Sequence, residues 1–193
     1  MRTNTSVLMA VFIIAGACTS GDSAAENEVA EAGTIANQSA SAAESTSASR
    51  QEADLEFLRM MSNHHEGLTQ WSELAMRRGT TESVRADAHE LHTKQMMERD
   101  SMVAMIRRDF GQEHTPAIMP QNRAQLDTLS ARPTAAFDTT YYRMVIDHHN
   151  AGIRMINNFL PRMQRPQVRQ MAEHMKSEQQ REVAELQRKL SAG

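Results

Sequence analysis

The stretch DLEFLRMMSNHH, residues 54–65, decides the fold, because it recurs as DTTYYRMVIDHH at residues 138–149. Five identities and one aromatic exchange within twelve aligned positions exceed the roughly one identity expected by chance. The same offset of 84 residues continues without a gap into the following segments. There, Val84, Arg85, Ala88, Gln95 and Glu98 match Val168, Arg169, Ala172, Gln179 and Glu182. The chain therefore contains an internal duplication.

Each repeat predicts a helical hairpin, because apolar side chains recur at the spacing of one helix face in both of its halves. We expect four long helices, over residues 52–78, 81–110, 135–160 and 165–190. Gly111 is suited to ending the second helix, and Pro166 to the first turn of the fourth. Because the two hairpins have similar apolar faces, their pairing predicts an all-α fold, a four-helix bundle.

The domain organisation follows from the repeat. The folded domain is expected to span residues 51–193, with repeat units 52–110 and 135–193. A crossover, residues 111–134, contains three of the five prolines and joins the units. A short helix around 121–131 fits within it.

The composition limits the core and the partners of this domain. Aromatic residues make up only 4% of the chain, whereas there are 15 Met, all but two of them at or after Met60. The core is therefore expected to consist of Met and aliphatic side chains. Residues 51–193 carry equal numbers of acidic and basic side chains, so the domain lacks the basic surface that binds nucleic acid.

The start of the chain predicts export. Residues 1–18 combine a basic residue, a short apolar run and small residues before Cys18, which resembles the lipobox of bacterial lipoproteins. Lipidation of Cys18 would anchor the domain on the periplasmic side of the cell envelope. The alternative is a secreted protein cleaved near Ala24. Residues 19–50 are rich in Ser, Ala, Glu and Thr and are expected to form a disordered tether.

The repeated His-His pairs predict a metal site. Residues four apart lie on one helix face, which places Met60 over His64, Met61 over His65 and Met144 over His148. Imidazole suits copper, zinc, iron or nickel, and thioether selects Cu(I), so the combination points to copper, as Cu(I) or Cu(II), before zinc or iron. Adjacent histidines differ by about 100° around a helix, so one of each pair, His64 or His65 and His148 or His149, is expected to face the bundle axis.

The second helix of each hairpin adds polar residues on an apolar stripe. Gln95, Glu98, Gln179 and Glu182 are expected to orient the imidazoles or to bind the metal, since a buried carboxylate needs a partner. Further candidates nearby are His89, His92, Met96, Met171, His174 and Met175. Taken singly, a His on an amphipathic helix or a Met stripe is more often core than ligand. Asp54 and Asp138 are expected to cap their own helices or to pair with arginine.

These residues resemble the bacterial family known as domain of unknown function 305. Its signature is an Asp, an aromatic residue, a Met and a His-His pair, followed by a helix with Gln-x-x-Glu. The resemblance covers about residues 52–190. It implies a ferritin-like fold, export, and copper binding or tolerance through His and Met in some members. The chain departs from the family at Asn63 and Asp147, where Pro is usual before the His pair, and at Glu66 and Asn150, where Gln is usual after it.

The leading hypothesis is a tethered envelope protein that sequesters, passes on or confers tolerance to copper without turnover. A ferritin-like oxidase is the second, although Glu98 and Glu182 are not followed by His at the spacing that di-metal bundles use. A haem-binding bundle and a structural module without metal are further alternatives. The sequence contains neither a nucleophile arrangement around its single Cys nor a Gly-rich phosphate loop. The sequence is also compatible with assembly into a homo-oligomer.

Overall fold

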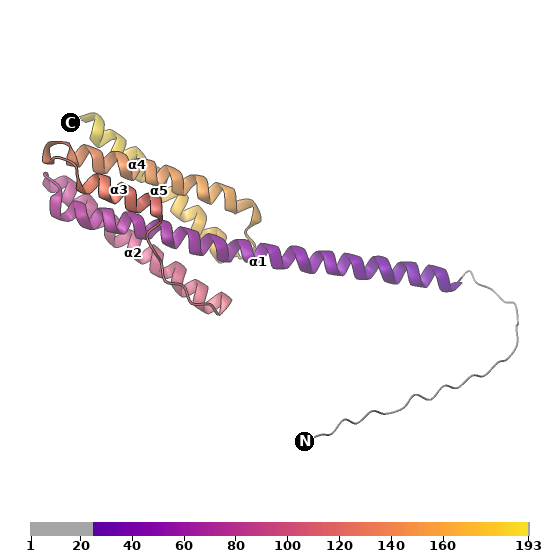
Figure 1. Cartoon of the computed structure of the whole chain (residues 1–193). Helices are drawn as coiled ribbons and strands as arrows, with labels where there is room; N and C mark the ends of the chain where they lie inside the picture. The colour runs from indigo at the N-terminus through magenta and orange to yellow at the C-terminus, as the bar shows by residue number, and fades with distance from the viewer. Residues whose placement is uncertain (1–24, 193) are drawn as a thin grey trace, which may run out of the picture. The chain divides into compact units, whose positions relative to one another are not determined.

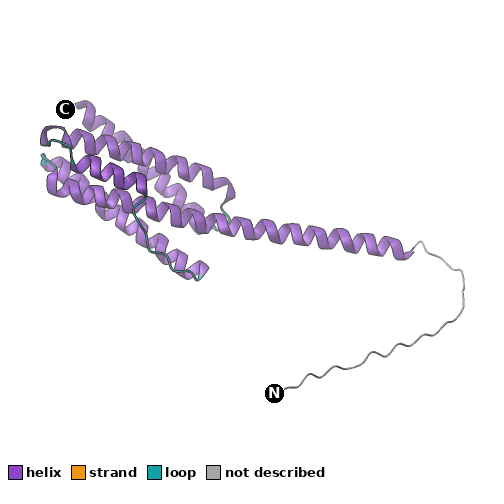
Figure 2. Cartoon of the chain, viewed as in Figure 1, coloured by secondary structure: helices purple, strands orange, loops and turns teal. Residues whose placement is uncertain are grey.

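The structure is a computed structural model that describes the backbone of residues 25–192 and side chains from Glu52 onward. Figure 1 shows its helices. In chain order they are α1 (Ala25–Arg78), α2 (Glu82–Phe110), α3 (Pro120–Ser130), α4 (Thr134–Phe159), the 3-10 turn η1 (Leu160–Arg162) and α5 (Pro166–Ala192). Within residues 25–192 every regular element is helical (Figure 2), so the predicted all-α class is confirmed.

Helices α2, α3, α4 and α5 begin and end within two residues of the predicted positions. The first helix differs, because α1 begins at Ala25 instead of near residue 52. Most of the segment predicted as a disordered tether is therefore helical. Ala, Glu and Gln are strong helix formers, and a segment with no apolar face can still adopt helix when it continues an adjoining one. The predicted export signal and Cys18 lie outside the described residues.

The chain divides after Ala43 into two units, and α1 contributes to both. The second unit, Glu44–Gly193, contains the bundle. Its long helices α1, α2, α4 and α5 lie side by side, with α3 beside them (Figure 1). Helices α4 and α5 share an extensive interface, and α3 packs on α4. The predicted four-helix bundle of two hairpins is therefore confirmed, with α3 as an addition within the crossover.

Two apolar clusters form the core of the bundle. The first contains Leu55, Phe57, Leu58, Met61, Met102, Met105, Ile106, Ile156, Phe159, Met163, Val168, Ala172 and Met175. The second contains Leu68, Trp71, Ala75, Val84, Ala88, Leu91, Leu129, Phe137, Tyr141, Tyr142, Val145 and Leu186. Each long helix contributes to both clusters, because the period of 3.6 residues keeps its apolar positions on one face along its length.

A band of polar residues separates the two clusters on every helix. We call it the polar layer, and it consists of His64, His65, Gln95, Glu98, His148, His149, Gln179 and Glu182. On α1, for example, the residues before His64 belong to the first cluster and those after His65 to the second. The duplication therefore brings its repeated polar residues to one level of the bundle.

The two hairpins are tied together by Asp54 and Asp138. Asp54 is fully buried and accepts hydrogen bonds from the backbone N–H groups of Gln164 (3.1 Å) and Arg165 (2.9 Å), just before α5. Asp138 accepts the equivalent bonds from Thr80 (2.8 Å) and Thr81 (3.1 Å), just before α2. Each aspartate therefore holds the start of a helix in the other unit, instead of capping its own helix or pairing with arginine as expected.

Hydrogen bonding also keeps Asp138, the partly buried member of this pair, ionised. Burial alone would raise the pKa of Asp138, but the hydrogen bonds from Thr80 and Thr81 hold that pKa below its usual value. Thr81 in turn caps α2, since its side chain accepts a bond from the Val84 N–H. The left-handed Gly111, with φ of 63°, ends the same helix.

Replacing Asp54 with Ala is expected to lower the free energy of unfolding by about 1–3 kcal/mol, because two backbone N–H groups lose the buried carboxylate that accepts their hydrogen bonds. Asp138→Ala is expected to act in the same direction. Urea unfolding followed by circular dichroism measures both. The control is Glu73→Ala, an exposed position on α1 whose loss is expected to cost under about 0.5 kcal/mol. Equal stability of Asp54→Ala and Glu73→Ala would contradict the capping role.

Candidate functional site

The polar layer places four imidazoles in the interior of the bundle. The exposed fractions of the side chains are 4% for His64 and His148 and 0% for His65 and His149. The sequence predicted that one histidine of each pair faces the axis while the other meets a neighbouring helix or solvent. The structure shows that all four are buried, with each member of a pair facing a different helix.

His64 of α1 and His148 of α4 face each other. Their ring centroids are 3.7 Å apart and their planes are inclined by 25°, which is a stacked arrangement. Trp71, one of the largest buried side chains, meets the His148 ring edge-on with centroids 5.0 Å apart. The repeat thus places its two first histidines in contact at the centre of the bundle.

The second histidines face the second helix of their own unit. His65 Nε2 lies 2.9 Å from Glu98 Oε2 on α2, and His149 Nε2 lies 2.9 Å from Glu182 Oε2 on α5. His65 Nδ1 also lies 2.9 Å from the Met61 carbonyl oxygen. Because both neighbours of the His65 ring are acceptors, both hydrogen bonds form together only when both ring nitrogens carry a proton.

The surroundings separate the histidines into two kinds. Both ring nitrogens of His64 and of His149, and Nε2 of His148, are buried without a hydrogen-bond partner, but His149 Nε2 has the Glu182 carboxylate beside it. His65, in contrast, is held at both nitrogens. A metal ligand needs a free lone pair on nitrogen, so His64 and His148, which lie against each other and not against a carboxylate, are the imidazoles best prepared to bind a cation.

Burial keeps the two stacked rings uncharged. It lowers the pKa of His64 to about 3, and the neighbouring His65 and His149 lower it further by charge repulsion. Burial likewise holds the pKa of His148 well below its ordinary value, with His64 as the next contributor. Both imidazoles are therefore neutral near pH 7, which is the protonation state that binds metal.

Lys94 makes the two carboxylates of the layer unequal. Its Nζ lies 2.6 Å from Glu178 Oε2 and 2.7 Å from Glu182 Oε1, which joins α2 to α5. Glu182 therefore has one oxygen on Lys94 and the other near His149. Burial would raise the pKa of Glu182, but His149 and Lys94 together lower it.

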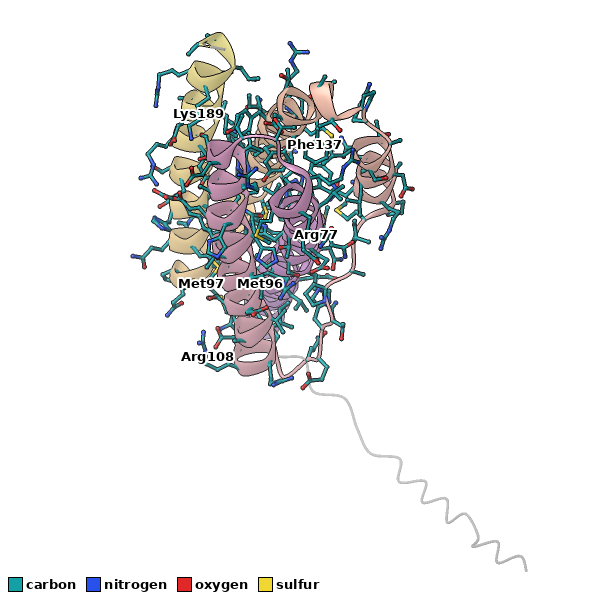
Figure 3. The ribbon with its side chains drawn as sticks, turned by 90° about the vertical axis from the view of Figure 1, so that its left-hand side faces the viewer. Arg77, Met96, Met97, Arg108, Phe137 and Lys189 are labelled. Atoms are coloured by element: carbon teal, nitrogen blue, oxygen red, sulfur yellow. The ribbon has the colours of Figure 1, made fainter. Side chains whose placement is uncertain are left out.

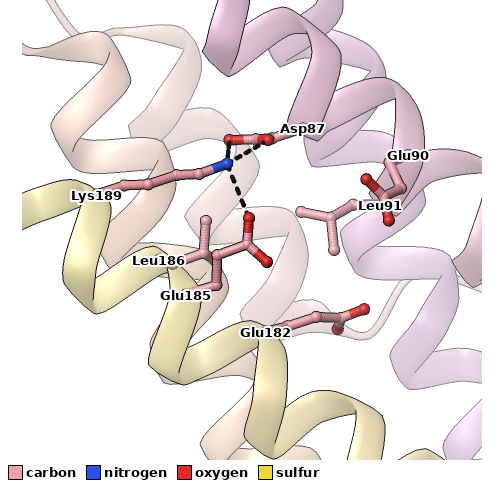
Figure 4. Close-up of a pocket in the computed structure, with 7 residues that line it drawn as sticks. All are labelled: Asp87, Glu90, Leu91, Glu182, Glu185, Leu186 and Lys189. Carbon is pink, nitrogen blue, oxygen red and sulfur yellow. Dashed lines mark hydrogen bonds and ion pairs between the residues drawn. The ribbon is translucent and has the colours of Figure 1, made fainter.

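A small pocket on the seam between α2 and α5 borders this carboxylate. Figure 4 shows its lining residues, Asp87, Glu90, Leu91, Glu182, Glu185, Leu186 and Lys189. Lys189 Nζ binds Asp87 at 2.6 and 2.7 Å and Glu185 at 3.1 Å. Lys94 and Lys189, the basic side chains at this seam, are thus both paired with carboxylates. Glu182 is the member of the polar layer that lines the pocket.

The predicted thioether ligands have different surroundings. Met61 and Met175 belong to the first apolar cluster and are almost fully buried. Met60 is partly buried against the same cluster, and Met144 against the second. Met60 and Met144 each precede a stacked histidine by one helical turn, which keeps them on its face of the helix.

The other candidates differ in burial. Gln95 and Gln179 are buried within it, with amide atoms that have no hydrogen-bond partner. His92 is partly buried, and His174 is exposed. Figure 3 shows Met96 and Met97 on α2, between Lys189 near one end of the bundle and Arg108 near the other. Met97 is 67% exposed.

Carboxylates and imidazoles alone do not enclose an ion here. Within the described part of the chain, no group of three or more His, Cys, Asp or Glu side chains is arranged to hold a metal. Thioethers are a separate donor class, and Met60 and Met144 are the ones that the repeat places beside the stacked pair.

Sequence reasoning missed two residues of the site. Trp71 follows His64 by two helical turns, a spacing that places both on one face, so its approach to the histidines was recoverable from the pattern. Lys94 carried no such signal, because its counterpart in the second repeat is Glu178 and only the packing of α2 on α5 pairs the two.

A family model described as "Domain of unknown function (DUF305)" matches residues 54–190. The chain belongs to the DUF305 family. The match begins at Asp54, the first residue of the repeated stretch, and covers both units. The resemblance drawn from the sequence is therefore confirmed.

Solved structures share the fold of this DUF305 domain. A DUF305 fragment from Deinococcus radiodurans has a TM-score of 0.66 and 23% sequence identity, covering 73% of this chain and 97% of that one. CopM in the Cu(I)-bound form has a TM-score of 0.63 at 21% identity, covering 72% and 96% of the two chains. CopM in the Cu(II)-bound form has a TM-score of 0.64 at 19% identity, with the same coverage of 72% and 96%.

Curated proteins offer no match to this DUF305 chain. Among the helices within residues 25–192, none combines the length and apolar character needed to cross a membrane.

The metal-free DUF305 domain is expected to lose stability as the pH falls below about 6.5. His64 and His148 take up protons in the unfolded chain at its ordinary pKa but in the folded chain only at a much lower pKa, so acid favours unfolding. Between pH 7 and pH 5 the loss from His64 is about 2 kcal/mol. Urea unfolding in the presence of a metal chelator, at pH 7 and at pH 5, measures this loss of free energy.

His64→Leu is expected to reduce the pH dependence of the free energy of unfolding by about the contribution of His64. The control His174→Ala, at an exposed position, is expected to leave it unchanged. An unchanged pH dependence in His64→Leu would show that the buried imidazole is not the source.

Proposed function

We propose that this DUF305 protein binds copper in the cell envelope, for sequestration, tolerance or trafficking, with no catalytic turnover. The observation that carries the proposal is the stacked pair His64–His148, whose buried and neutral imidazoles have ring nitrogens without hydrogen-bond partners. An unpartnered buried polar atom costs about 1–3 kcal/mol, so an apolar pair would be the more stable choice for packing alone. Metal binding gives these nitrogens a partner.

The donor chemistry favours copper. Imidazole binds Cu(I) and Cu(II), and thioether prefers Cu(I), so Met60 and Met144, each one helical turn from a stacked histidine, favour the soft ion among those that approach the pair. Zinc and iron would be bound by the imidazoles alone. The fold that this chain shares with CopM, whose structures are of Cu(I)- and Cu(II)-bound forms, agrees with a copper ligand.

The stacked geometry adds a requirement. The lone pairs of an imidazole lie in the plane of its ring, so two rings stacked at 3.7 Å do not direct them at one point. Binding one ion between His64 and His148 therefore requires that at least one ring turns about its side-chain bonds. His65 and His149, held near Glu98 and Glu182, would stay as the fixed frame around the moving pair.

The location is part of the proposal. The apolar start of the chain is typical of an export signal, and Cys18 is placed for attachment of a lipid. A DUF305 protein from Streptomyces coelicolor described as secreted, with a TM-score of 0.61 and 21% identity, supports export. The membrane would then be a partner only through the lipid at Cys18.

Copper binding is expected to quench the fluorescence of Trp71, the single Trp of the chain, because its ring lies 5.0 Å from that of His148. The experiment titrates residues 51–193 with Cu(I), Cu(II) and Zn(II), with elemental analysis of the product. The variant His64→Leu/His148→Leu is expected to lose the quenching and to bind Cu(I) at least about tenfold more weakly.

A matched control replaces two exposed histidines, His89→Ala/His174→Ala, and is expected to titrate like the wild type. Melting temperatures of both variants establish that they are folded. If the stacked-pair variant binds each metal as tightly as the control, the proposed site is wrong.

A further inference from the structure

The stacked histidines are buried, so an ion needs a path to them. A groove of about 710 Å³ opens on the surface between the start of the bundle part of α1 and the end of α2. Its lining residues are Glu52, Leu55, Glu56, Arg59, Met60, Phe110 and Gln112. Met60 is the only predicted metal ligand among them. The groove therefore brings solvent to one thioether of the candidate site.

Met60 also stands next to His64. Residues four apart on a helix lie one above the other, with Cβ atoms about 5–6 Å apart. His64 is only 4% exposed, whereas Met60 is partly buried and lines the open groove. Met60 therefore separates the groove from the buried imidazole by one helical turn.

The charges along the groove favour a cation. Glu52 and Glu56 are exposed carboxylates on its α1 side. Arg59, the basic residue among the lining side chains, donates a hydrogen bond to the side chain of Gln112, which holds its guanidinium across to the segment after α2. Two carboxylates against one engaged guanidinium leave net negative charge at the mouth, which attracts a positive ion.

The groove at the matching place of the second unit does not include Met144. A groove beside Thr139 and Arg143, the counterparts of Leu55 and Arg59, is lined on its other side by Lys189, Leu190 and Ala192 of α5. Met144 is not among its lining residues, and instead packs against the second apolar cluster. Both thioethers are partly buried, and they differ in that Met60 lines a groove whereas Met144 does not line the matching one.

We propose that Met60 is a transfer ligand that takes up Cu(I) from the groove and passes it to His64. The step is ligand exchange without a change of oxidation state. A bond from copper to the Met60 sulfur forms as the donor's neutral ligand leaves, and that bond breaks as the His64 nitrogen binds. This inference rests on the proposed copper function, and adds a direction of loading through the first unit.

The test measures the rate of loading in the full domain. Cu(I), supplied anaerobically as its acetonitrile complex, is mixed with protein in stopped flow, and Trp71 fluorescence follows arrival at the stacked pair. Met60→Leu is expected to slow loading about tenfold or more while the final amount of bound copper stays the same. Leu has nearly the volume of Met, so the fold is expected to be kept, as a melting temperature verifies.

Met144→Leu is the matched control and is expected to load within about twofold of the wild-type rate. Equal rates in wild type and both variants would overturn the transfer role, as would equal slowing in both variants. A lower final amount of copper in Met60→Leu would also overturn it, because Met60 would then be a permanent ligand. If the wild-type protein binds no copper, both the proposed function and the transfer role fail. The final amount of bound copper shows this without any measurement of rate.

Discussion

The burial of four imidazoles at one level of an apolar bundle is the constraint on which the rest of the structure depends. The stacked nitrogens of His64 and His148 have no hydrogen-bond partner, which costs about 1–3 kcal/mol for each such atom. Apolar clusters above and below the layer supply the compensating stability. A packing role does not account for this arrangement, since aliphatic side chains of similar size would fill the same space without the cost. The copper ion that we propose would give these nitrogens a partner.

The duplication places the repeated polar residues in one layer, and two aspartates hold the two units of the repeat together. Asp54 holds the start of α5, and Asp138 holds the start of α2, so each unit completes a helix terminus of the other. The hairpins are therefore parts of one structure, and the candidate site forms where they meet. Gly152 permits a close approach between α4 and α5, since a Cβ atom there would lie 2.6 Å from Gln179 Oε1 of the layer.

The two copies have diverged in charge and in access. Lys94 stands where the second unit has Glu178, and it neutralises Glu182, whereas Glu98 has His65 as its partner. Met60 lines a groove on the first unit, whereas Met144 is not among the residues that line the matching groove beside the end of α5. A symmetric pair of rings thus sits within an asymmetric frame, which is what a site loaded from one side requires.

The sequence by itself determined the repeat, the helix positions apart from the start of α1, and the identity of the polar layer, because these depend on residue types at helical spacing. The family also followed from the residues at 54–65 and 138–149. Only the tertiary structure decided which histidine of each pair stacks, that Asp54 and Asp138 cap the opposite unit, and that Lys94 pairs with Glu182. These contacts join residues on different helices, and their pairing depends on how the helices are rotated and offset against each other. Helical periodicity fixes a face, but it does not fix which neighbour that face meets.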